Sequence, residues 1–150
     1  MLVIEPANPR DPGPAALLAS SHDLMNTLYL PEDNFALDID ALCAPDIHFF
    51  TARDGAAILG TGALAVRPGY GEVKSMFTAS EARGKGVAAA LLRQLEDHAR
   101  SLDLPVLRLE TGEELASAVR LYERNGFTRC AAFGDYKPNK YSIFMEKNLT

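Results

Sequence analysis

The chain has 150 residues, of which 47% are hydrophobic and 23% charged, and its formal net charge is -5 at pH 7. This length and composition predict one domain over residues 1–150 with a single hydrophobic core. The negative charge and the lack of a basic patch argue against a duplex nucleic acid partner, and no apolar run approaches the roughly 18–20 residues that span a membrane. Cys43 and Cys130 lie far apart, without a C-x-x-C spacing, which argues against a metal site or a disulfide framework and is typical of the reducing cytoplasm.

The N-terminal half is predicted to hold a short first strand, a helix and a β-hairpin. The proline-rich segment from Pro6 to Pro14 is interpreted as a loop, and Ala15 to Tyr29 as a helix with an apolar stripe. Asp38 to Cys43 is a candidate for a second, short helix. The patterns that follow predict a hairpin with the turn Asp54-Gly55 and then a third strand, at Ile47–Arg53, Ala57–Val66 and Tyr70–Thr78.

The C-terminal half shows helical periodicity in two places. The first helix face consists of Val87, Leu91, Leu95, Ala99 and Leu102. The second consists of Leu115, Ala118, Val119 and Tyr122 and ends at Asn125-Gly126. Strands are predicted at Pro105–Glu110, Phe127–Phe133 and Tyr141–Lys147. A hairpin followed by β-α-β-α-β indicates a mixed α/β fold with a right-handed crossover. The strands before and after the helix that begins near Gly86 are expected to form one parallel pair.

The turn around Gly84-Lys85-Gly86 fits more than one phosphate-binding spacing. A Walker loop is excluded, because Lys85 is followed by Gly86 rather than Ser or Thr. Gly84 to Ala89 fits the dinucleotide pattern G-x-G-x-x-A, and Glu110 lies 24 residues after Gly86, where a dinucleotide-binding fold places its ribose-binding acid. However, five residues, 79–83, separate the predicted strand from Gly84, and the 40 residues after Glu110 are too few to complete a doubly wound sheet. Dinucleotide binding is therefore a remote alternative.

The same turn also has the features of a pyrophosphate site. Glycine permits close approach of the backbone to a ligand, and the N–H groups at the start of a helix attract phosphate. Arg83 and Lys85 add positive charge beside these groups. The predicted anion site consists of Arg83, Gly84, Lys85, Gly86, Val87 and Ala88.

Two motifs in this chain resemble the GNAT superfamily of acyl-CoA-dependent N-acetyltransferases. Arg83-x-x-Gly86-x-Ala88 is similar to the family's cofactor motif [QR]-x-x-G-x-[GA], and the segment LYERNGF resembles its C-terminal signature, in the same order and spacing. The resemblance covers nearly the whole chain and implies a mixed, mostly antiparallel sheet of six or seven strands with about four helices. The segments LETG and FGDYKPNKYSIFMEKNL are further similar to a bacterial subgroup labelled indole-acetic-acid-type acetyltransferases. The chain departs from the family at Leu115, where many members have an Asn that contacts the cofactor.

The resemblance implies direct transfer of an acetyl group from acetyl-CoA to a primary amine of a small molecule or peptide. It implies that the pantetheine arm pairs with the backbone of Met76, Phe77 and Thr78, on a strand that splays from its neighbour beside a bulge. A backbone N–H in that gap would polarise the thioester oxygen. The alternative is a CoA-binding sensor or partner module without efficient turnover. The sequence identifies neither the acceptor amine nor whether the chain forms a homodimer.

Tyr122 matches the position of the family's general acid, which protonates the departing CoA thiolate, although it also fits a core position on its helix. Glu72 is a candidate general base, acting directly or through water, and an exposed strand carboxylate is an equally good interpretation. Glu110 is a comparable candidate at the end of the next strand, where the resemblance places the acceptor site. His48 and Tyr136 are further candidates for contacts with the acceptor, and a polar hairpin rim explains Tyr136 equally well. No metal site is predicted.

Overall fold

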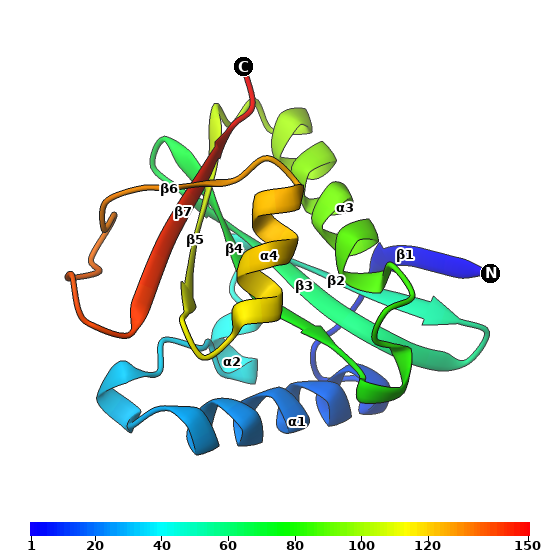
Figure 1. Ribbon diagram of the computed structural model, residues 1–150. Helices are drawn as coiled ribbons and strands as arrows, with labels where there is room; N and C mark the ends of the chain where they lie inside the picture. Colours follow the sequence, from blue (N-terminus) through cyan, green and yellow to red (C-terminus); the bar gives the residue numbers. More distant parts are fainter.

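The computed structural model describes residues 1–150 and contains a seven-stranded sheet in the order β1-β2-β3-β4-β5-β7-β6 (Figure 1). The strands are β1 Leu2–Pro6, β2 Ile47–Asp54, β3 Ala57–Arg67, β4 Tyr70–Thr78, β5 Val106–Gly112, β6 Thr128–Arg129 and β7 Ser142–Asn148. The α-helices are α1 Pro12–Leu28, α2 Ile39–Leu42, α3 Val87–Ser101 and α4 Ala116–Arg124, and two 3-10 turns are η1 Pro31–Asp33 and η2 Ser80–Ala82. All strand pairs are antiparallel except β4 and β5, which are joined through α3. The predicted mixed, mostly antiparallel sheet with one parallel pair is confirmed.

The helices cover both faces of this sheet (Figure 1). On one face α3 and α4 pack over the larger core, into which α3 buries the predicted stripe of Val87, Leu91, Leu95 and Ala99. On the other face α1 and α2 contribute Leu18 and Leu42, which pack with Phe49 of β2 and Ala63 of β3. Successive side chains of a strand point to opposite faces, so the same strands supply both cores. None of the helices has the length and apolar character needed to cross a membrane.

Several element boundaries differ from the sequence prediction, and three of the differences have a clear structural context. The helix α1 begins at Pro12, inside the segment predicted as a loop, because proline in the first helical turn has a suitable φ and needs no N–H partner there. Leu102, expected on the buried stripe of α3, instead follows the last helical residue and is 40% exposed. The predicted strand from Phe127 to Phe133 shortens to β6, because the chain leaves the sheet edge and Phe133 packs against Tyr70 and Phe144.

The feature of the fold that matters most for function is a gap between β4 and β5. The two strands pair only at Gly71–Leu107 and Glu72–Arg108, and from Val73 onward β4 has no partner on this side. A bulge in β4 accompanies the divergence: the register with β3 shifts, and Ser75 has a φ of 54°. Thr61 on β3 donates a hydrogen bond of 2.7 Å to the Ser75 carbonyl and fixes the bulge. Bulges bend the strand that contains them, so the sheet is open at this point.

Candidate active site

A cavity of about 110 Å³ occupies the opening between β4 and β5. Its walls include residues of α1 and the segment after it, such as Met25 and Phe35, and residues of α4, such as Ala118 and Tyr122. Because α1 and α4 cover opposite faces of the sheet, the cavity connects the two faces through the gap. A larger open depression lies beside Val106 and Lys147, on β5 and β7, and contains none of the predicted site residues.

The predicted anion site lies in the exposed turn that leads from η2 into α3. Gly84 and Gly86 both have a φ of 78°, a conformation that favours glycine, and Gly86 caps the helix. The N–H groups from Gly84 to Ala89 donate to no acceptor of the chain, since the first bond of α3 runs from the Ala90 N–H to the Gly86 carbonyl. No atom lies within 4 Å of the position that a Cβ would take at either glycine. The turn therefore presents a row of free donors to an open space.

Positive side chains flank these donors without being neutralised. Arg83 and Lys85 are exposed, and neither takes part in the ion pairs of the chain. Val87 is buried and anchors the helix start to the core. Free amides at a helix N-terminus together with two free cations suit a di-anionic group such as a pyrophosphate.

Tyr122 and Glu110 are two of the titratable groups that line the cavity. Tyr122 on α4 is 6% exposed and packs edge-on against Phe127, and burial, followed by the charge of Glu110, raises the pKa of its hydroxyl. Glu110 on β5 accepts a hydrogen bond of 2.7 Å from Ser142. Burial raises the pKa of Glu110, and the nearby Glu72 adds to the rise, whereas the Ser142 hydrogen bond and Lys74 oppose it. The site thus combines a phenol that keeps its proton with a carboxyl group that binds a proton more readily than usual.

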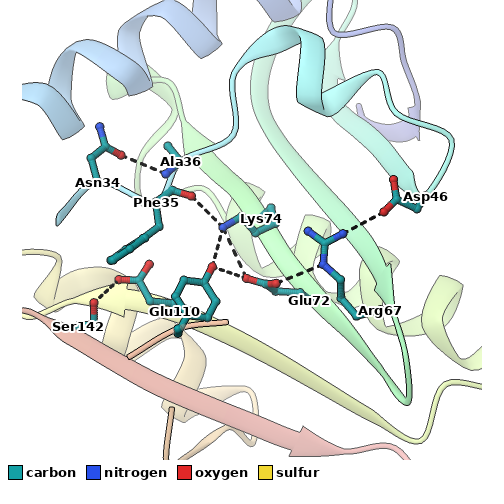
Figure 2. Close-up of polar contacts among 10 residues, drawn as sticks. Asn34, Phe35, Ala36, Asp46, Arg67, Glu72, Lys74, Glu110 and Ser142 are labelled. Atoms are coloured by element: carbon teal, nitrogen blue, oxygen red, sulfur yellow. Dashed lines mark hydrogen bonds and ion pairs between the residues drawn. The ribbon is translucent and has the colours of Figure 1, made fainter. Parts of the chain in front are cut away.

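Glu72 is buried rather than exposed, so it is not an ordinary surface carboxylate on a strand. Figure 2 shows it between two cations: Lys74 Nζ lies 3.5 Å from one carboxylate oxygen, and Arg67 Nε lies 3.6 Å from the other. Tyr136 donates a further hydrogen bond of 2.6 Å to Glu72. Arg67 continues the network to Asp46 at 2.9 Å (Figure 2). Both oxygens of Glu72 are therefore engaged by neighbouring side chains.

Lys74 joins this network to the segment that covers the cavity. Its ammonium group donates to the Phe35 carbonyl at 3.0 Å (Figure 2). It also donates to the Tyr136 hydroxyl at 2.9 Å, and the Lys74 side chain is only 9% exposed. The ring of Tyr136 packs edge-on against Phe35. Burial, and then the charge of Glu72, raises the pKa of Tyr136. Segments distant in the sequence, at residues 35, 72–74 and 136, are thus held together beside Glu110.

Comparison with known proteins agrees with this geometry. The sequence profile of the Acetyltransferase (GNAT) family matches residues 17–127. Over 127 residues the chain is 43% identical to the IAA acetyltransferase of Azospirillum brasilense, with 83% of each protein covered. The chain belongs to the GNAT acetyltransferase family.

Solved structures support the same assignment. A protein of Klebsiella pneumoniae described as an acyl-CoA N-acyltransferase has the same fold, with a TM-score of 0.84, 33% sequence identity and coverage of 100% of this chain and 99% of the other. The PaiA N-acetyltransferase of Thermoplasma acidophilum, solved in complex with coenzyme A, shares the fold at a TM-score of 0.75 and 17% identity, with 99% of both chains covered. The GNAT fold predicted from the two motifs is therefore confirmed.

The structure brings the predicted residues of β4, β5, α4 and the last loop together around the cavity, places residues 83–88 in the turn before α3, and leaves His48 apart. Glu72, Glu110 and Tyr136 belong to one cluster, Met76 and Tyr122 line the cavity beside it, and Phe77 and Thr78 continue the free edge of β4. Leu115, which replaces the Asn of many members, caps α4 and also lines the cavity.

His48 lies on the α3 face of β2 rather than beside the acceptor cavity. Its Nδ1 is 3.0 Å from Nε2 of His98 on α3, and the rings are tilted at a centroid distance of 4.5 Å. His98 also packs edge-on against Phe50. The physical reason is the alternation of the strand, which points His48 to the same face as the core residue Phe50.

This pair of histidines predicts a loss of stability in mild acid. Burial, and then the charge of His48, lowers the pKa of His98 in the folded chain. The unfolded chain, with a histidine pKa of about 6.5, therefore binds the proton first, so stability should fall as the pH drops below about 6.5. His98→Gln retains a polar partner for His48 but does not titrate, so its melting temperature should fall less between pH 7.5 and 5.5. Parallel pH dependence of the two proteins would contradict a role for His98.

Lys74 and Tyr29 belong to this site but are not among the residues predicted from the sequence. Lys74 stands two positions after Glu72 on β4, and this period-two spacing would have placed both side chains on one face. Tyr29 follows the last residue of α1 and lines the cavity, with the end of its ring next to Gly112. Nothing in its local sequence indicates that position, because it depends on how α1 packs across the sheet.

Proposed function

We propose that this GNAT protein transfers an acetyl group from acetyl-CoA directly to a primary amine of a small molecule or peptide. The observation that carries the proposal is the open gap between β4 and β5, whose cavity is lined by the half-buried carboxyl group of Glu110 and the buried phenol of Tyr122. The turn that follows β4 adds a row of free N–H groups suited to phosphate. A module that only binds CoA would not need this combination of an acid and a base at the gap.

The residues present fit acetyl-CoA. The free N–H groups from Gly84 to Ala89 and the cations Arg83 and Lys85 would hold its pyrophosphate. The edge of β4 from Met76 to Thr78 has no strand partner on the β5 side, so its backbone would pair with the amides of the pantetheine arm. A related fold solved with coenzyme A supports this assignment. When bound, acetyl-CoA supplies a thioester that reacts with a neutral amine.

Glu110 is better suited than Glu72 to remove the proton from the acceptor ammonium. Glu110 lines the cavity and has a single side-chain hydrogen bond, whereas both oxygens of Glu72 are engaged by Tyr136, Lys74 and Arg67. A base works best when its pKa lies near the working pH, and burial moves the pKa of Glu110 in that direction. Glu72 and its partners position the cavity wall. The charge of Glu72 raises the proton affinity of Glu110, whereas that of Lys74 lowers it.

Tyr122 is the proton donor for the sulfur that leaves. Its hydroxyl keeps its proton at neutral pH, because burial raises its pKa above the ordinary tyrosine value. It lies on α4, across the cavity from the α1 segment. A phenol here can pass a proton to a thiolate, which is a strong base in a buried site.

The proposal is tested by following thiol release from acetyl-CoA with a panel of primary amines. Amine-dependent thiol release, with the acetylated amine detected by mass spectrometry, is expected. Binding of CoA by calorimetry without turnover on any amine would instead support the sensor module.

Gly86→Asp tests separately whether the turn before α3 binds the pyrophosphate of CoA. The new carboxylate would occupy the open space in front of the free amides and repel the pyrophosphate, so the Kd for CoA in calorimetry should rise by at least about 100-fold. Gly69→Asp is a matched control, because Gly69 also has a positive φ, of 82°, with open space around it, but lies in the turn between β3 and β4. Equal CoA affinity of the two variants would overturn the assignment, as would tight binding of NAD.

A further inference from the structure

The hydroxyl of Tyr29 is the only buried side-chain nitrogen or oxygen in the chain without a hydrogen-bond partner. Tyr29 lines the cavity, and the end of its ring packs so closely on Gly112 that a Cβ at this glycine would overlap the hydroxyl oxygen. Its ring also contacts Tyr141 edge-on at 6.4 Å, which fixes its direction. A buried hydroxyl without a partner is costly, and such groups are often satisfied by a ligand.

The surroundings of this hydroxyl are negative. Burial is the main cause that raises the pKa of Tyr29, and the charges of Glu110, Glu114 and Glu113 all add to the rise. The backbone amide of Glu114 lowers the pKa of Tyr29 but does not form a hydrogen bond with its hydroxyl. Asp33 adds a further carboxylate to the cavity wall. A neighbouring group that donates hydrogen bonds and carries positive charge would be stabilised here.

The cavity has no free cation for an acidic ligand. Lys74 is the only lysine or arginine that lines it. Its ammonium group already donates to the Phe35 carbonyl and the Tyr136 hydroxyl and lies 3.5 Å from Glu72. A carboxylate on the acceptor would therefore meet Glu110 and Asp33 without a compensating donor, which is unfavourable in a partly buried site.

We propose that the acceptor is a cationic amine without a carboxylate, such as an alkyl diamine, and that one of its N–H groups donates to the Tyr29 hydroxyl. This inference rests on the proposed function and identifies the class of the acceptor. Glu110 takes up the proton of the amine that reacts. Tyr29 and Asp33 hold the second nitrogen, which stays charged.

Three molecules of equal chain length test the charge preference: 1,4-diaminobutane, butylamine and 4-aminobutanoate. Their binding is measured by calorimetry on the CoA-saturated protein, so that the result does not depend on turnover. The diamine should bind at least about 10-fold more tightly than 4-aminobutanoate, and added salt should reduce the difference. Equal or tighter binding of 4-aminobutanoate, or no binding of the diamine, would overturn the proposal.

Tyr29→Phe removes only the hydroxyl and tests its role. The diamine affinity should fall by roughly 10-fold, the scale of a hydrogen bond to a charged group, while the Kd for CoA stays the same. The melting temperature of Tyr29→Phe without ligand should equal or exceed that of the wild type, because the substitution removes a buried hydroxyl that has no hydrogen-bond partner. Tyr141→Phe is the matched control, since it removes the hydroxyl from the adjacent ring. Unchanged diamine affinity in Tyr29→Phe would refute the assigned contact, and loss of CoA binding would count against the proposed function instead.

Discussion

Glu110→Gln is expected to lower kcat/KM for the amine by about 10²- to 10⁴-fold, the range for loss of a general base. Glutamine keeps the shape of the side chain and an oxygen that accepts the Ser142 hydrogen bond, so the fold and the CoA site should be preserved. The wild-type pH profile should lose activity as the pH falls through the raised pKa of Glu110, because the protonated form cannot act as a base. This acid limb should disappear in the variant.

Glu72→Gln distinguishes a positioning role from a basic one. It removes the negative charge between Lys74 and Arg67, so it should lower the melting temperature by leaving two cations incompletely paired. The residual activity should still show an acid limb, now shifted to lower pH, because Glu72 no longer raises the pKa of Glu110. If Glu72→Gln abolishes the limb while Glu110→Gln keeps nearly full activity, the two roles are reversed.

Tyr122→Phe should slow the chemical step by roughly 10²-fold or more, because it removes the proton donor to the leaving sulfur. The ring and its edge-on contact with Phe127 remain, so stability and the KM for acetyl-CoA should change little. Single-turnover kinetics measure the step directly, and an acceptor amine must be found first.

Tyr70→Phe provides the control for this substitution. Tyr70 is also a buried tyrosine, but it packs with Phe133 and does not line the cavity. Near-normal single-turnover rates in a folded Tyr122→Phe protein would leave Tyr122 as a packing residue.

The sequence was informative where structure depends on local pattern. The apolar stripe of α3 and the glycines at its start follow from side-chain spacing and from backbone conformations that favour glycine, and both are found in the fold. The parallel pair of β4 and β5 follows from the handedness of a β-α-β connection. The motif that begins at Arg83 and the segment LYERNGF together predicted the GNAT family, which neither motif indicates alone.

The inner cluster could not be predicted, because its members meet only through tertiary packing. Tyr136 and Glu72 are 64 residues apart in the sequence, and Lys74 contacts a carbonyl 39 residues before it. Whether Glu72 is exposed or buried depends on the segments at Phe35 and Tyr136, which have no regular periodicity. For the same reason the sequence alone could not choose between Glu72 and Glu110.

The central claim is that acetyl-CoA and an amine react directly at the gap between β4 and β5. The most direct test is a single-turnover reaction with excess enzyme, quenched at successive times and analysed by mass spectrometry for free CoA, acetylated amine and acetylated protein. Direct transfer predicts one acetylated amine for each CoA released and no acetylated protein when the amine is omitted. Release of CoA without amine, with the acetyl group attached to the protein, would contradict the claim.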